Sequence, residues 1–119
     1  MPSHDTLYLL KPDFMDPNRG NIRYLCRECV EVAGLFEYYP QLWSHVHVRY
    51  VEFQRPRAEL AALIGEENQG CPVLVLGDDT SADLPSRPGV QRAHGRAFVA
   101  GAENIEAYLA HLHDIGVAY

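Results

Sequence analysis

Two of the three cysteines in this chain, Cys26 and Cys29, lie three positions apart where apolar residues begin to recur at spacings of three and four. This periodicity predicts a helix over residues 26–39, with both cysteines in its first turn. Residues i and i+3 of a helix share a face, so the two sulfurs are expected to meet. The spacing therefore allows a disulfide, a reactive dithiol or two ligands of one metal ion.

Cys26, at the start of the predicted helix, is the expected nucleophile of the pair. The first N–H groups of a helix have no partner within it and carry partial positive charge, which favours a thiolate over a thiol. Arg27 would add to this effect and Glu28 would oppose it. The sequence leaves the net effect of these two neighbours open.

The composition is that of one soluble globular domain spanning residues 1–119. Hydrophobic residues make up 47% of the chain and charged residues 22%, which is typical of neither a disordered nor a membrane protein. No basic region followed by an apolar stretch opens the chain, and no apolar run reaches the roughly 18 residues of a membrane helix. We therefore expect a cytoplasmic protein without membrane contact.

The net charge is −6 and Lys11 is the only lysine. Such a chain lacks the basic surface that attracts a phosphate backbone, so nucleic acid is not an expected partner. The odd number of cysteines argues against a secreted disulfide scaffold. In a reducing compartment, a close cysteine pair serves catalysis or metal binding more often than permanent crosslinking.

Apolar runs and turn residues predict four strands and three helices. Residues 13–25 and 77–95 are rich in proline, glycine and polar residues and are expected to be long loops, the second a wide loop rather than a tight hairpin. A right-handed βαβ connection makes the first two strands parallel, and an antiparallel pair and a last helix follow. The strands are expected at residues 6–10, 46–53, 71–76 and 96–100, and the helices at 26–39, 56–65 and 105–115.

This element order, the spacing Cys26-x-x-Cys29 and the placement of Pro72 at the start of the third strand together resemble the thioredoxin-like superfamily in its compact, glutaredoxin-sized form. The resemblance implies an α/β fold of order βαβαββα, in which three helices flank a four-stranded mixed sheet. Three segments also look like a bacterial family of small proteins of unknown function that is grouped with these folds, namely residues 7–12, 65–69 and 72–76. That closer similarity implies the fold and carries no activity.

Carried over by position, Cys26 matches the attacking thiol of the superfamily and Cys29 the resolving thiol. Pro72 matches the cis-proline beside them. The backbone of Cys71 matches the segment that pairs with a peptide or glutathione substrate. The resemblance thus implies thiol–disulfide exchange with a protein or glutathione disulfide, without a bound cofactor.

Two further matches concern glutathione as a co-substrate. Lys11, just after the first strand, resembles the glutaredoxin lysine that meets a glutathione carboxylate. Gly101 opens a turn that resembles the one holding the other end of glutathione. The chain departs from both patterns in its Arg27-Glu28 dipeptide, so a reduction potential cannot be transferred from either thioredoxin or glutaredoxin.

Cys71 is a third thiol, which this fold would bring against the other two. Three convergent thiols also suggest a zinc, copper(I) or iron–sulfur site on Cys26, Cys29 and Cys71. A closed zinc site needs a fourth ligand, for which His94 is the histidine we nominate. In a further alternative, the protein is a non-catalytic binding module and its cysteines are small core residues.

Overall fold

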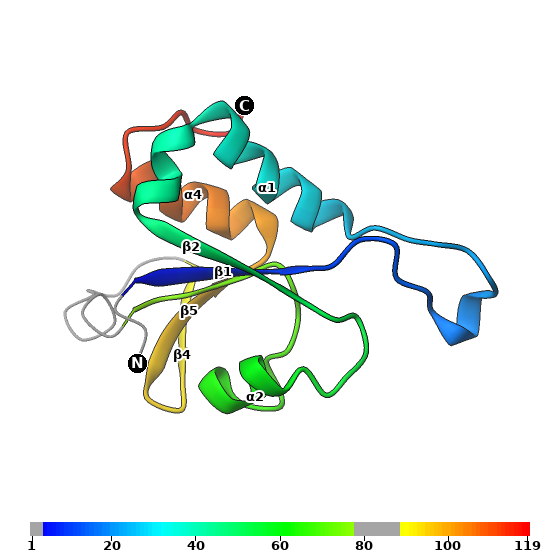
Figure 1. Cartoon of the computed structure of the whole chain (residues 1–119). Coiled ribbons are helices and arrows are strands. Elements are labelled where there is room, and N and C mark those ends of the chain that lie inside the picture. Colours follow the sequence, from blue (N-terminus) through cyan, green and yellow to red (C-terminus); the bar gives the residue numbers. More distant parts are fainter. Residues whose placement is uncertain (1–3, 78–88) are drawn as a thin grey trace.

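In the computed structural model, which describes residues 4–77 and 89–119, a mixed sheet lies between helices on both of its faces (Figure 1). Helices α1 (Arg27–Tyr38) and α4 (Ala102–Leu112) pack together on one face. Helix α2 (Ala58–Ile64) covers the other face. None of the helices in these two ranges has the length and apolar character needed to span a bilayer.

The described residues form five strands, one more than expected. The order across the sheet is β2-β1-β3-β5-β4, with β1 parallel to β2 and the remaining neighbours antiparallel. Because β1 and β3 run in opposite directions, the C-terminal end of β1 and the N-terminal end of β3 lie at the same end of the sheet. The strands are β1 (Asp5–Leu10), β2 (Val46–Val51), β3 (Val73–Val75), β4 (Val90–Ala93) and β5 (Arg96–Ala100).

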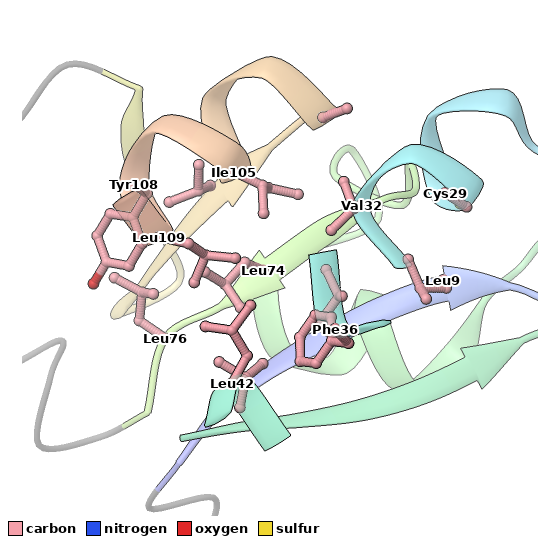
Figure 2. Close-up of a cluster of buried hydrophobic side chains, with 14 of the residues drawn as sticks. Leu9, Cys29, Val32, Phe36, Leu42, Leu74, Leu76, Ile105, Tyr108 and Leu109 are labelled. Carbon is pink, nitrogen blue, oxygen red and sulfur yellow. The ribbon is translucent and has the colours of Figure 1, made fainter. Parts of the chain in front are cut away.

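The sheet is apolar on both faces because successive side chains of a strand point to opposite sides. In β1, Leu7 and Leu9 pack toward α1 and α4, whereas Tyr8 packs toward α2. The larger core lies between the sheet and the α1–α4 pair (Figure 2), where Leu74 of β3 meets Ile105 of α4. Burial on both faces explains why β1 reads as a continuous apolar run.

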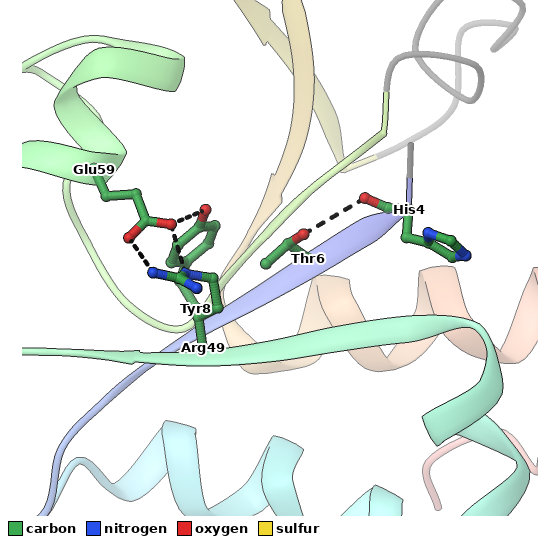
Figure 3. Close-up of polar contacts among 5 residues, drawn as sticks. All are labelled: His4, Thr6, Tyr8, Arg49 and Glu59. Carbon is green, nitrogen blue, oxygen red and sulfur yellow. Dashed lines mark hydrogen bonds and ion pairs between the residues drawn. The ribbon is translucent and has the colours of Figure 1, made fainter. Parts of the chain in front are cut away.

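A polar cluster ties α2 to the first two strands (Figure 3). The hydroxyl of Tyr8 donates to a carboxylate oxygen of Glu59 over 2.8 Å, and Arg49 of β2 lies 2.6 Å from the same carboxylate. Tyr8 is only 3% exposed. The cluster therefore satisfies a phenol that would otherwise be buried without a partner.

Helix α1 begins and ends where the sequence predicts. Cys26 is the N-cap residue, with an extended backbone, and its sulfur accepts the N–H of Cys29. At the other end, the N–H of Tyr39 donates to the carbonyl of Leu35, and Pro40 then starts a 3-10 helix, Pro40–Ser44. Proline lacks the N–H that would continue the α-helical ladder, which explains the stop.

The prediction of a wide loop over residues 77–95 is wrong for the second half of this range. Residues 78–88 lie outside the described residues, but β4 follows them and pairs with β5 through a tight turn at His94 and Gly95, with φ of 53° and 77°. Left-handed φ at two successive residues is typical of a two-residue hairpin, for which Asn-Gly or Asp-Gly is the usual signal. His-Gly lacks that signal, and β4 is a half-exposed edge strand without apolar alternation.

Several boundaries also differ from expectation. Strand β3 is limited to Val73–Val75, because Cys71 and Pro72 precede its ladder. Helix α2 starts at Ala58, two residues after Pro56, with Arg57 as its N-cap residue. Residues 11–26 leave the sheet as a long excursion (Figure 1) that contains the 3-10 helix Pro17–Arg19 and returns to the start of α1.

Candidate thiol site

Cys26 lies at the mouth of α1 as the sequence predicts. Its Sγ accepts the backbone N–H of Cys29 over 3.2 Å, and its thiol donates to the carbonyl oxygen of Cys71 over 3.9 Å. The Cys26 side chain is half-buried, so it is accessible from solvent. Both contacts position the sulfur between the first turn of α1 and the segment that leads into β3.

Cys29 lies beneath Cys26 and is 4% exposed. Its Sγ accepts the N–H of Leu10, at the end of β1, over 3.4 Å. Burial, followed by the hydrogen bond of its thiol to Cys26, raises the pKa of Cys29 well above that of a free thiol, although the Leu10 N–H acts in the opposite direction. Cys29 therefore keeps its proton at neutral pH.

Cys71 and Pro72 face this pair from the start of β3. The peptide bond between them is cis, and the N–H of Gly101 donates to the Pro72 carbonyl over 3.1 Å. Burial raises the pKa of Cys71 to about 11, partly opposed by the positive charge of Arg57 and Arg55. The structure thus brings three thiols that differ in burial close to the Cys71–Pro72 segment.

Two cavities flank the thiols. The first, of about 200 Å³, includes Cys26 and Cys29 in its lining and is otherwise mostly apolar, with Leu25, Val30 and Tyr50 at its exposed rim. The second, of about 240 Å³, lies on the side of Cys71. Cys26 borders the first cavity and contacts the residue that borders the second.

The second cavity has a more polar lining. Glu28 reaches across from the first turn of α1 and accepts the N–H of Ala102, at the start of α4, over 2.9 Å. Gly101, the N-cap residue of α4, lines the cavity beside Pro72. A Cβ at Gly101 would lie 3.8 Å from the Glu28 carboxylate. The dipeptide between the two cysteines therefore connects α1 directly to α4.

The two residues that the glutathione match assigned line different cavities. Gly101 lies beside Cys71 and Pro72, whereas Lys11 forms an ion pair with Glu52 over 2.6 Å and borders a different cavity. The substrate-binding roles of both residues remain predictions.

Arg57 is a buried cation that sequence reasoning missed. It is 7% exposed, and its guanidinium donates to the carbonyls of Glu52, Phe53 and Gln69. Burial lowers the pKa of Arg57, and the nearby thiols act in the opposite direction. Because Gln69 leads into Cys71, Arg57 holds the segment that carries the third thiol. Nothing in the polar run around Arg57 signals its burial.

The metal alternative gains no support from the arrangement of possible ligands. Within residues 4–77 and 89–119, no group of three or more His, Cys, Asp or Glu side chains is arranged to hold a metal ion. The nominated fourth ligand, His94, lies in the β4–β5 turn with its Nε2 3.2 Å from Glu67. The described residues thus offer no ligand set for this alternative, which stays a prediction.

Fold and site together define a mixed α/β protein with a cysteine pair at the start of a helix. The family described as "Protein of unknown function (DUF3088)" matches the chain over residues 4–117, and the chain belongs to this family. The expected similarity to proteins of unknown function is thus confirmed. No curated protein and no solved structure matches the chain.

Proposed function

We propose that this protein is a thiol–disulfide oxidoreductase of the thioredoxin-like kind, with Cys26 as the attacking thiol and Cys29 as the resolving thiol. One observation carries the proposal: the half-buried sulfur of Cys26 accepts a helix N-terminal N–H, while the buried sulfur of Cys29 lies one turn further along the same helix. Cysteines become reactive where such donors favour the thiolate and solvent can reach the sulfur.

The topology also supports the proposal. Without β4, the sheet order is β2-β1-β3-β5, with a parallel first pair and an antiparallel second half. This arrangement agrees with the four-stranded mixed sheet that the resemblance implies, and β4 is then an addition at the edge beside β5. Pro72 and the carbonyl of Cys71 lie next to the attacking sulfur in this reading.

The reaction consists of two exchange steps. The Cys26 thiolate attacks one sulfur of a substrate disulfide, which forms a mixed disulfide on Cys26 and releases one thiolate. Cys29 then loses its proton and attacks Cys26 Sγ, which forms the Cys26–Cys29 disulfide and releases the second thiolate. Two electrons pass from the protein to the substrate, and an external dithiol returns the protein to its reduced form.

The proposal is tested with reduced protein and a small disulfide reagent. We expect the wild type to gain one intramolecular disulfide, seen as two fewer alkylations by intact mass. Cys26→Ser should abolish the reaction, and Cys29→Ser should accumulate the mixed disulfide. Cys71→Ser serves as the matched third-thiol control and should still oxidise. A wild type that keeps all its thiols after prolonged exposure would contradict the proposal.

A non-catalytic binding module is the second candidate, and the apolar cavity beside Cys26 favours it. Leu25 and Val30 at its rim are 60% and 55% exposed, and exposed apolar side chains around a cavity are typical of a binding site. This candidate predicts that Cys26→Ser leaves partner binding intact. Loss of partner capture on Leu25→Asp, with normal thiol reactivity, would show that the protein has both properties.

A further inference from the structure

The carboxylate of Glu28 occupies a backbone N–H that could otherwise bind an incoming anion near the thiols. Its Oε1 accepts the N–H of Ala102, the first residue of α4, over 2.9 Å. The first N–H groups of a helix are unpaired within it and attract negative charge. Here the chain itself supplies that charge, from the residue directly before Cys29.

Among the residues that the structure describes, carboxylates and no basic side chain line the cavity beside Cys71. Glu28 and Glu67 are its charged lining residues, and the remaining described ones are neutral. Burial raises the pKa of Cys71 and the charge of the buried cation Arg57 partly opposes this rise, but Arg57 is held by backbone carbonyls and does not line the cavity. Glu67 is 65% exposed in its side chain and is paired with His94. Glu28 is thus the lining carboxylate that a backbone N–H holds in place.

A substrate disulfide attacked by Cys26 must place the rest of its molecule against this site. Because Cys26 contacts the Cys71 carbonyl, a group on that side of the attacked disulfide would lie next to the cavity that Glu28 borders. A carboxylate there meets like charge and finds its N–H donor already occupied. A neutral or cationic group meets no such repulsion.

We propose that Glu28 is a specificity-determining residue that makes the thiol site discriminate against anionic disulfides and favour neutral or cationic ones. This inference rests on the proposed function and names its substrate class. Glutathione disulfide, with a net negative charge, is then a poor substrate, and peptide disulfides with neutral or basic neighbours are good ones.

The test compares three probes: glutathione disulfide as the anionic one, 2-hydroxyethyl disulfide as the neutral one and cystamine as the cationic one. Each oxidation rate is followed by intact mass after alkylation and is divided by the rate of the same probe with a free cysteine derivative. For the wild type we expect the normalised rate with glutathione disulfide to be about tenfold or more below the neutral rate.

Glu28→Gln keeps an oxygen that accepts the Ala102 N–H and removes the charge. It should raise the ratio of the glutathione disulfide rate to the neutral rate at least about threefold. A change in the acidity of Cys26 alters both rates alike and cancels in this ratio. Glu37→Gln, an exposed change on α1, alters the net charge equally and should shift none of the ratios. Higher salt should raise the wild-type rate with glutathione disulfide relative to the neutral probe, which tests the inference without a variant.

The outcomes distinguish this inference from the function on which it rests. Equal normalised rates for the three probes, or an equal change for all of them in Glu28→Gln, would overturn the role of Glu28 while thiol exchange stands. Failure of all three probes to oxidise the protein would overturn thiol exchange itself.

Discussion

The backbone N–H of Cys29 donates to the sulfur of Cys26 over 3.2 Å, so the second cysteine of the pair helps to position the first. This contact exists only because Cys26 is the N-cap residue of α1 and Cys29 lies in its first turn. The two sulfurs also differ in burial. The Cys26 sulfur is half-exposed, whereas Cys29 lies in the core beside Leu9 and Val32 (Figure 2).

The first prediction concerns the order in which the thiols are alkylated. At neutral pH we expect Cys26 to react first with iodoacetamide, because Cys29 is buried and its pKa is raised. The pKa of about 11 for Cys71, against 9.0 for an ordinary thiol, lowers its thiolate fraction about 100-fold. Peptide mapping by mass spectrometry over time measures all three rates. Faster alkylation of Cys29 than of Cys26 would contradict this assignment.

A second prediction concerns the Tyr8–Glu59–Arg49 cluster (Figure 3). Partial burial acts to raise the pKa of Glu59, but the hydrogen bonds from Arg49 and Tyr8 outweigh it, and the pKa is lowered. A carboxyl with a lowered pKa in the folded state stabilises the fold above its unfolded pKa, and this contribution is lost as the pH falls through the folded value. The stability from this cluster should therefore decline in acid.

Substitution tests the same cluster at neutral pH. Tyr8→Phe and Glu59→Gln should each lower the free energy of unfolding by about 1 kcal/mol, since the remaining partners of Glu59 are largely exposed. Chemical denaturation of the two single variants and the double variant measures the coupling. Fully additive losses would mean that the charge of Glu59 adds nothing to its hydrogen bond with Tyr8.

The third prediction concerns Glu106 on α4. Burial, followed by a hydrogen bond with Glu31 and repulsion from Glu31 and Glu103, raises the pKa of Glu106 to about 7. A carboxyl with a raised pKa in the folded state contributes stability in full below its unfolded value, near 4.5, and this stability is lost as the pH rises toward 7.

Glu106→Gln should therefore stabilise the protein at pH 8, by about 1 kcal/mol, and make little difference at pH 4. Thermal unfolding at both pH values measures this. Glu103→Gln, on the exposed side of α4, removes only one of the repelling charges and should show a smaller difference between the two pH values. Destabilisation of Glu106→Gln at pH 8 would contradict the proposed repulsion.

A fourth prediction compares two glycines. Gly34 lies in the middle of α1 on its exposed side, and a Cβ there would have no neighbour within 4 Å. Gly34→Ala should therefore stabilise the protein by about 0.5–1 kcal/mol. Gly65 ends α2 with a φ of 96°, and a Cβ there would collide with the His94 ring. Gly65→Ala should destabilise by more than about 1 kcal/mol. Denaturant midpoints of the two variants should therefore move in opposite directions.

The sequence by itself determined the elements whose signals are local. Apolar periodicity and Pro40 delimit α1, an uninterrupted apolar run marks β1, and the cysteine spacing places two sulfurs at a helix start. Such features depend on neighbours along the chain, so they can be read without the fold. Strand β4 was not predicted, because an edge strand needs little apolar content and its His-Gly turn lacks the usual hairpin residues.

Only the tertiary structure decided which distant residues meet at the thiols. The hydrogen bond from Ala102 to Glu28, the packing of Leu10 on Cys29 and the burial of Arg57 against the carbonyl of Gln69 all join separate segments. Residue types alone cannot reveal such contacts, because a carboxylate or guanidinium near a turn is most often solvated. The geometry of these contacts follows from how α1, α4 and the Cys71 segment converge at one end of the sheet.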